Sequence, residues 1–144
     1  MNIIFFIIFT ITNFLLIFKV NQRFKPKVTA IAYGISFIVV PILMLASAYL
    51  LRIFKVANGN VAEQLYINVV FTLMVIIFLN LFLLLSDVMV NGLLNFQERH
   101  NTANINSNPI KFALNNKLNI KSFCRILFFL GSILGFYGIW LAKK

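Results

Sequence analysis

Long apolar runs separated by short polar stretches are the dominant pattern along this chain of 144 residues. A helix needs about 20 apolar residues to cross a hydrocarbon layer of about 30 Å. Four runs meet or approach this length, and the charged residues gather mainly between them. Extended into their flanks, the runs predict four transmembrane helices, at about residues 3–20, 28–52, 65–95 and 122–142.

Helix is the expected conformation of all four runs, because open strands would leave backbone N–H and C=O groups unpaired in lipid. The composition agrees with this expectation: 61% of the residues are hydrophobic, 11% are charged, and the mean hydropathy is +0.94. A soluble domain carries about 25% charged residues. We therefore expect an all-α, polytopic integral membrane protein, a four-transmembrane-helix bundle that forms a single membrane domain over residues 1–144.

The first run has two interpretations, an uncleaved anchor and a signal peptide. A signal peptide has cations before its apolar region and a cleavage site of small residues after it. Here no cation precedes the run, and the next cations follow it at Lys19, Arg23, Lys25 and Lys27. An uncleaved helix is the interpretation that we favour.

The net charge of +10 comes from 13 Lys and Arg against 3 acidic residues. The cations lie between apolar runs, where they meet lipid phosphates, so the expected partner is the lipid bilayer and not nucleic acid. The first and third gaps hold nine cations, four at residues 19–27 and five at residues 99–125, against four on the opposite side. By the positive-inside rule both termini lie outside, in what we expect to be a bacterial inner (cytoplasmic) membrane.

Two of the connections have the composition of turns. The second, residues 55–64, contains Asn58-Gly59-Asn60 and predicts an antiparallel hairpin of the second and third helices. The third, residues 96–121, is rich in Asn before Pro109 and predicts a cytoplasmic loop. At its end, residues 110–121 mix apolar side chains with Lys, which leaves two alternatives, a segment on the membrane surface and a solvated loop.

Four polar residues form one narrow face of the third predicted helix. At about 100° per residue, spacings of seven, four and four place them together: Asn80, Asp87, Asn91 and Asn95. One interpretation is an ion or proton path with Asp87 as its carboxylate. We favour an interfacial ion pair of Asp87 with Arg125, or with Lys121, because one carboxylate at a helix end lacks the buried partners that relays use.

Small residues mark one face of the fourth predicted helix: Gly131, Gly135 and Gly138. This spacing lets a second helix approach closely, either in another subunit of a homo-oligomer or, as we favour, within the same bundle. Tyr137 and Trp140, near the outer end of this helix, predict aromatic anchors at the membrane interface. Asn13 and Asn80 are expected to form a hydrogen bond between the first and third helices.

The titratable residues do not predict an enzyme. Glu63, Asp87, Glu98 and His100 are spread along the chain and do not converge on one site. The single Cys and single His leave no set of metal ligands of those types. We therefore expect no catalytic residue, no metal and no cofactor.

The function that these features favour is that of a small accessory subunit or interaction protein of a larger membrane complex. Its partners would be other membrane protein subunits, bound through helix faces and the cytoplasmic loop. Two alternatives remain, a membrane immunity or exclusion protein and a small transporter or channel with Asp87 in its path. Because four helices make too small a bundle for a pore, transport would require a self-associating homo-oligomer.

Overall fold

The computed structural model describes residues 2–23, 26–53, 60–101 and 107–142, and these residues form helices without any β-strand. In chain order the elements are α1 (Asn2–Leu15), the π-helical segment η1 (Leu16–Val20), α2 (Asn21–Arg23), α3 (Pro26–Ile53), α4 (Asn60–His100), α5 (Ile110–Asn115) and α6 (Lys117–Trp140). Four helical stretches are long and apolar enough to cross a membrane: Asn2–Arg23, Val28–Tyr49, Glu63–His100 and Lys117–Trp140. The prediction of an all-helical fold with four such helices is confirmed.

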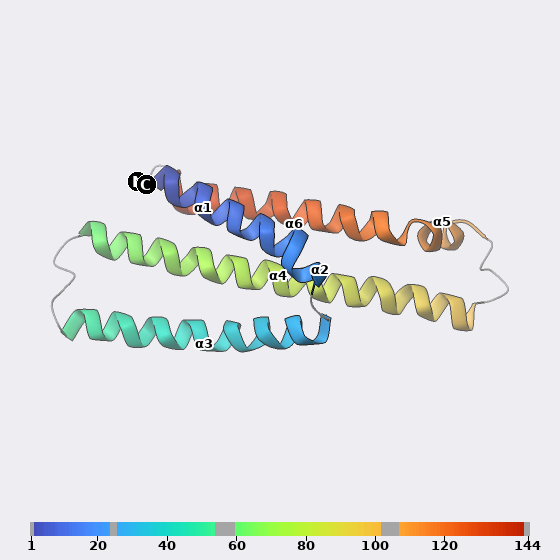
Figure 1. Cartoon of the computed structure of the whole chain (residues 1–144), viewed down its shortest axis with the longest axis horizontal. Helices are drawn as coiled ribbons and strands as arrows, with labels where there is room; N and C mark the ends of the chain where they lie inside the picture. Colours follow the sequence, from blue (N-terminus) through green and yellow to red (C-terminus); the bar gives the residue numbers. More distant parts are fainter. Residues whose placement is uncertain (1, 24–25, 54–59, 102–106, 143–144) are drawn as a thin grey trace.

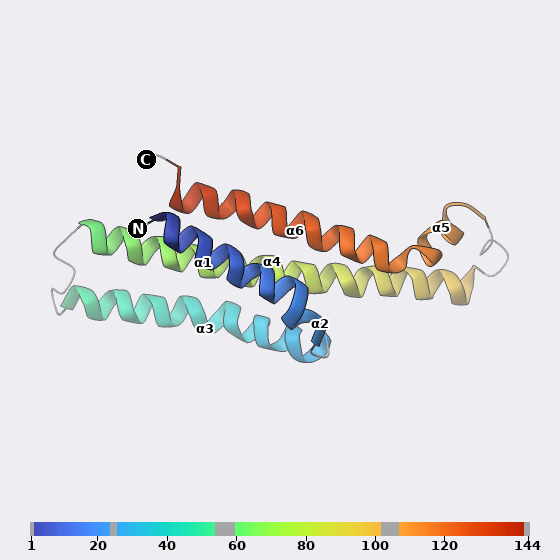
Figure 2. The ribbon, with the colours of Figure 1, turned by 45° about the horizontal axis from the view of Figure 1, so that its top comes forward.

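α4 is the longest helix, with 41 residues, which corresponds to a length of about 60 Å. Both α3 and α6 pack along it, and α1 packs against α6 (Figure 1). α1 and α4 run in one direction, whereas α3 and α6 run in the other, so α1 begins at the end of the molecule where α6 finishes (Figure 2). α4 is therefore the element around which the other helices are arranged.

The helices extend beyond the predicted spans. α4 begins at Asn60 and continues to His100, because its last turns contain no Pro or Gly to end the helix and Gln97 accepts a hydrogen bond from Asn101 at 2.9 Å. α6 begins at Lys117 and α5 is a separate short helix, so less of the predicted loop at 96–121 is irregular than expected. The predicted turn residues Asn58, Gly59, Asn104 and Asn106 lie outside the described residues.

Two contacts at different heights show that α6 and α4 run side by side. In α4, Thr72 and Asp87 are fifteen residues apart. Their partners in α6, Trp140 and Arg125, are separated by the same number of residues. The two helices therefore stay in register over about 22 Å, at 1.5 Å per residue.

α3 keeps its register with α4 in the same way. Tyr66 of α4 lies within hydrogen-bond distance of Ser47 of α3. Asn80 lies fourteen residues further along α4, and Tyr33 lies fourteen residues back along α3. The side chain of Asn21 in α2 forms a hydrogen bond with both. By the same count the first residue of α3 lies level with Asp87, so α4 continues beyond α3 for about 20 Å.

Trp140 is only 2% exposed, so its predicted role as an interfacial anchor is wrong. Its ring stacks on Phe5 and Phe9 of α1, with ring centroids 5.0 and 5.8 Å away. Its indole N–H donates to the Thr72 hydroxyl at 2.8 Å, which satisfies the polar group inside the bundle. Tyr137, in contrast, is more than half exposed.

Replacing Trp140 should separate its two contributions. Trp140→Phe keeps an aromatic ring against α1 but removes the bond to Thr72, and should cost about 0.6–1.7 kcal/mol, the range for bonds between membrane helices. Trp140→Ala also leaves a cavity and should lower the thermal midpoint in mild detergent further. Tyr137→Phe is the matched control and should change the midpoint little; equal effects of Trp140→Phe and Tyr137→Phe would contradict the buried bond.

Candidate functional site

Three asparagine side chains meet at the centre of the bundle. The Asn80 amide of α4 donates to Asn13 Oδ1 of α1 at 2.9 Å and also to the Ile76 carbonyl oxygen at 2.8 Å. Asn80 Oδ1 in turn accepts from Asn21 Nδ2 of α2 at 2.7 Å. Asn13 and Asn80 are fully buried, and the predicted bond between them is confirmed.

Tyr33 adds the fourth helix to this amide network. Its hydroxyl donates to Asn21 Oδ1 at 2.9 Å, so a chain of hydrogen bonds runs from α3 through α2 and α4 to α1. Each bond of this type between membrane helices is worth about 0.6–1.7 kcal/mol. The network therefore sets how the helices are rotated relative to one another more than it adds to the stability.

The π-helical segment η1 explains how Asn13 and Asn21 reach the same partner. These two residues are eight positions apart, and in a regular α-helix they would be rotated by about 80° from each other. A π-helical turn holds more residues, so each residue advances by a smaller angle. With η1 between them, Asn13, Ile17 and Asn21 are all buried.

Asp87 and Arg125 form an ion pair between α4 and α6, with Arg125 Nη2 at 3.3 Å from Asp87 Oδ2. Both side chains are about four-fifths buried. Asp87 Oδ1 and Arg125 Nε, both buried, have no hydrogen-bond partner among the described residues. The structure thus brings together the carboxylate and the guanidinium that the sequence singles out, in a partly enclosed setting where losing one partner is costly.

The remaining residues of the polar face do not join this pair. Asn80 lies two turns away, inside the amide network. Asn91 is half-buried and Asn95 is exposed, and both follow Asp87 in the part of α4 that extends beyond α3. Their common face is therefore divided into a buried centre, an ion pair and a more exposed end.

Within the part of the chain that the structure describes, the three glycines of α6 do not form a close helix contact. A Cβ atom at Gly135 would meet Val75 Cγ1 of α4 at 3.6 Å, an ordinary contact distance. At Gly131 and Gly138 it would meet no described atom within 4 Å. The packing within the bundle that we favoured for this face thus involves Gly135 alone.

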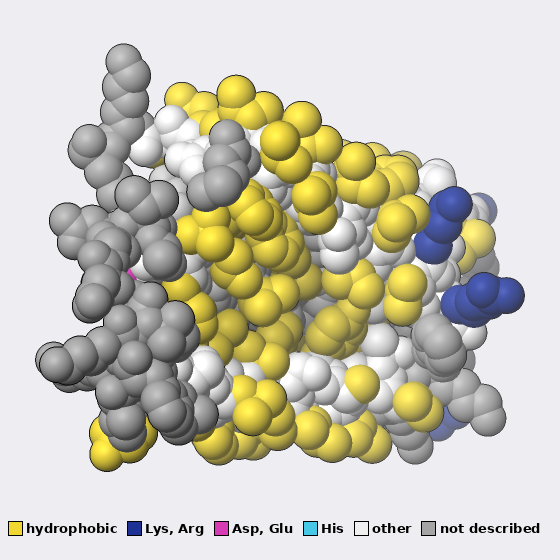
Figure 3. Space-filling view, turned by 60° about the vertical axis from the view of Figure 1, so that its left-hand side comes forward, with side chains coloured by type: hydrophobic (Ala, Val, Ile, Leu, Met, Phe, Trp, Pro, Cys, Tyr) yellow, Lys and Arg dark blue, Asp and Glu magenta, His cyan; other side chains and the backbone are white. Residues whose placement is uncertain are grey.

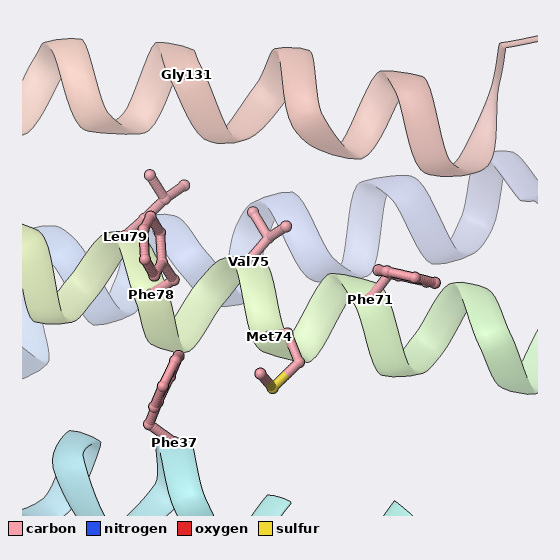
Figure 4. Close-up of a pocket in the computed structure, with 7 residues that line it drawn as sticks. All are labelled: Phe37, Phe71, Met74, Val75, Phe78, Leu79 and Gly131. Carbon is pink, nitrogen blue, oxygen red and sulfur yellow. The ribbon is translucent and has the colours of Figure 1, made fainter. Parts of the chain in front are cut away.

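Gly131 borders an apolar groove of about 370 Å³ on the face of α4 between α3 and α6. Phe37 of α3 lies at one side of the groove, and α4 supplies the rest of the lining (Figure 4): Phe71, Met74, Val75, Phe78 and Leu79. No charged side chain contributes to this lining, so the groove suits hydrocarbon or an apolar protein surface.

Within the described ranges, no three side chains of His, Cys, Asp or Glu gather where they could hold a metal ion. No family model matches the chain, and neither the curated proteins nor the solved structures contain a significant match to it. What the fold defines is an all-helical chain with four apolar helices compatible with a multi-pass membrane protein.

Asn21 is the member of the amide network that the sequence did not predict. It lies just beyond the first predicted span, and a regular helix would turn it away from Asn13. Asn13, Ile17 and Asn21 are separated by steps of four. In a regular α-helix each such step rotates by about 40°, so burying all three side chains on one line requires the wider π-helical turn, which the spacing alone does not predict.

Removing the central amide should destabilise the bundle. Asn80→Leu keeps the number and branching of the side-chain heavy atoms but leaves Asn13 Oδ1 and Asn21 Nδ2 without their partner on α4. We expect a cost of about 1–3 kcal/mol for each buried group left unsatisfied. We expect a lower midpoint of unfolding in mild detergent. Asn95→Leu is the matched control on the same helix and should change the free energy of unfolding by less than about 0.5 kcal/mol; similar losses in both variants would contradict the network.

The ion pair predicts that losing one charge lowers the stability more than exchanging the two charges does. Asp87→Asn or Arg125→Gln alone should lower stability, because each leaves the other charge partly buried and unpaired. The exchanged variant, Asp87→Arg with Arg125→Asp, restores opposite charges and should recover part of that loss. A thermal midpoint of the exchanged variant at or below the lower single variant would argue against a direct pairing.

Proposed function

We propose that this chain is a non-enzymatic, multi-pass membrane protein that acts as an accessory subunit or interaction protein of a larger membrane complex. In this proposal the four apolar helices cross a bacterial inner membrane with both termini outside. The Asp87–Arg125 pair then lies at the inner boundary of the hydrocarbon layer, level with the start of α3. The positive-inside rule supports this orientation.

The observation that carries the proposal is a helical extension beyond this boundary. We define the inner extension as residues 88–100 of α4, α5, and residues 117–124 of α6. It reaches about 20 Å past Asp87. Phe112 and Leu118 are 63% and 78% exposed on it. In the proposed placement these side chains lie beyond the hydrocarbon layer, and apolar side chains with this exposure favour a surface that binds protein over a solvated loop.

Three lysines lie close in sequence to these apolar side chains. Lys111, Lys117 and Lys121 belong to the same part of the inner extension. On the face that Figure 3 shows, the Lys and Arg side chains gather at one end, beyond a largely hydrophobic surface. A partner with an acidic rim around an apolar centre would match this surface, because interfaces generally combine a hydrophobic core with a polar rim.

The buried polar groups favour a binding role over transport. Asn13, Asn21, Asn80 and Tyr33 are bonded to one another, and the Asp87 carboxylate already pairs with Arg125. An ion path through Asp87 would have to break that pair at each passage. The open groove on α4 is lined by apolar side chains and offers no ligands to an ion.

The proposal is tested by purifying the tagged chain from its native membrane in mild detergent. We expect unrelated membrane proteins in constant proportion to it. Phe112→Ser with Leu118→Ser should reduce their recovery at least fivefold, because the apolar contacts are lost. The matched control, Asn115→Ser with Asn119→Ser, changes two neighbouring exposed residues and should not reduce it.

Two outcomes would overturn the proposal. In the first, both double variants recover the partner as well as the unchanged chain does, or no partner is recovered at all. In the second, the purified chain alone carries ions across liposome membranes and Asp87→Asn abolishes the flux.

A further inference from the structure

The outward face of α1 combines exposed apolar side chains with two cations at its far end. The apolar side chains follow one another at steps of four and three, and we call them the α1 stripe: Ile4, Ile8, Ile11 and Leu15. Lys19 continues the stripe in η1, and Arg23 follows four residues later in α2. Both cationic side chains are exposed. This face therefore changes from apolar to cationic along its length.

The amide network explains why Lys19 and Arg23 point outward. Asn21 lies between them in sequence and is buried through its bonds to Asn80 and Tyr33. Two residues along a helix rotate by about 200°, so the cations on either side of Asn21 are directed away from the centre of the bundle. The wide turn of η1 that buries Asn21 thus also brings both cations to the side of the α1 stripe.

The acidic residues of the chain lie elsewhere. There are three of them in the whole sequence, and Asp87 is already paired with Arg125. Glu63 lies in the first turn of α4, and Glu98 lies eleven residues beyond Asp87, about 16 Å along the helix. The two cations of α1 and α2 are also one turn apart, a spacing at which like charges repel. An anion bound between them would offset this repulsion.

The two cations lie at the inner boundary of the hydrocarbon layer in the membrane placement proposed above. α2 lies beside the start of α3 (Figures 1 and 2), and the start of α3 is level with Asp87. From Leu15 back to Ile4 the α1 stripe covers about 17 Å. This length is close to half of a hydrocarbon layer of about 30 Å, the part that one leaflet occupies.

We propose that Lys19 and Arg23 bind the phosphate group of an anionic phospholipid of the inner leaflet, with an acyl chain along the α1 stripe. An amphiphile of this kind matches both parts of the face. A zwitterionic headgroup carries a cation of its own, which the two side chains repel, so the site prefers a lipid with net negative charge. Each Lys or Arg near an anionic membrane surface contributes about fivefold to the affinity. The inference needs the proposed membrane placement but not the proposed partner protein.

The test measures which lipids the purified chain retains. The chain would be reconstituted in nanodiscs with equal amounts of phosphatidylglycerol and phosphatidylcholine, released into mild detergent and analysed by native mass spectrometry. We expect phosphatidylglycerol to be retained at least fivefold over phosphatidylcholine. Lys19→Gln with Arg23→Gln should remove this preference. The matched control, Arg99→Gln with Lys111→Gln, removes two exposed cations from the inner extension, gives the same net charge and should keep the preference.

Three outcomes would overturn the inference. The unchanged chain retains both lipids equally, or the two double variants lose the preference equally, or inorganic phosphate displaces the lipid and is thereby identified as the ligand. A protein that Lys19→Gln with Arg23→Gln releases, while the lipid preference stays the same, would also contradict it. Phe112→Ser with Leu118→Ser should leave the lipid preference unchanged, so a failure of the proposed function is recognised separately.

Discussion

The hydrogen bonds of the Asn80 amide are the interaction on which the arrangement of this molecule depends. Helices in lipid gain little from burying apolar surface against one another, so packing and a few polar bonds select their rotation. Asn80 bonds to Asn13 and Asn21, and Tyr33 extends the network to α3. Once these groups face inward, the rotation of α4 is set and its opposite face is directed outward.

The other features follow from that rotation. Asp87 lies seven residues after Asn80 on the same side of α4, and there it meets Arg125 of α6. The apolar face of α4 is left exposed on the other side, between α3 and α6. Because α3 begins level with Asp87 while α4 continues to His100, the apolar face and the polar face both extend beyond the four-helix part. The same helix thus organises the bundle and extends beyond it.

The number and approximate position of the helices could be predicted because apolar length alone carries that information. The Asn13–Asn80 bond was also predictable, since two amides in apolar helices need partners. The ends of the helices were harder to predict, because polar residues such as those near Asn95 continue a helix as readily as they end it. The burial of Trp140 depends on which helix lies beside it, which composition does not encode. The outward face of α4 could not be singled out, because almost every position around this helix between Phe71 and Phe96 is apolar.

The account is tested most directly by a double-mutant cycle between Asn13 and Asn80, which isolates the contact at its centre. The variants Asn13→Leu, Asn80→Leu and the double variant would be compared by their free energies of unfolding in mild detergent or bicelles. A direct bond predicts that the double variant loses less than the sum of the single losses, with a coupling of about 0.6–1.7 kcal/mol. Additive losses would contradict the central role given to Asn80.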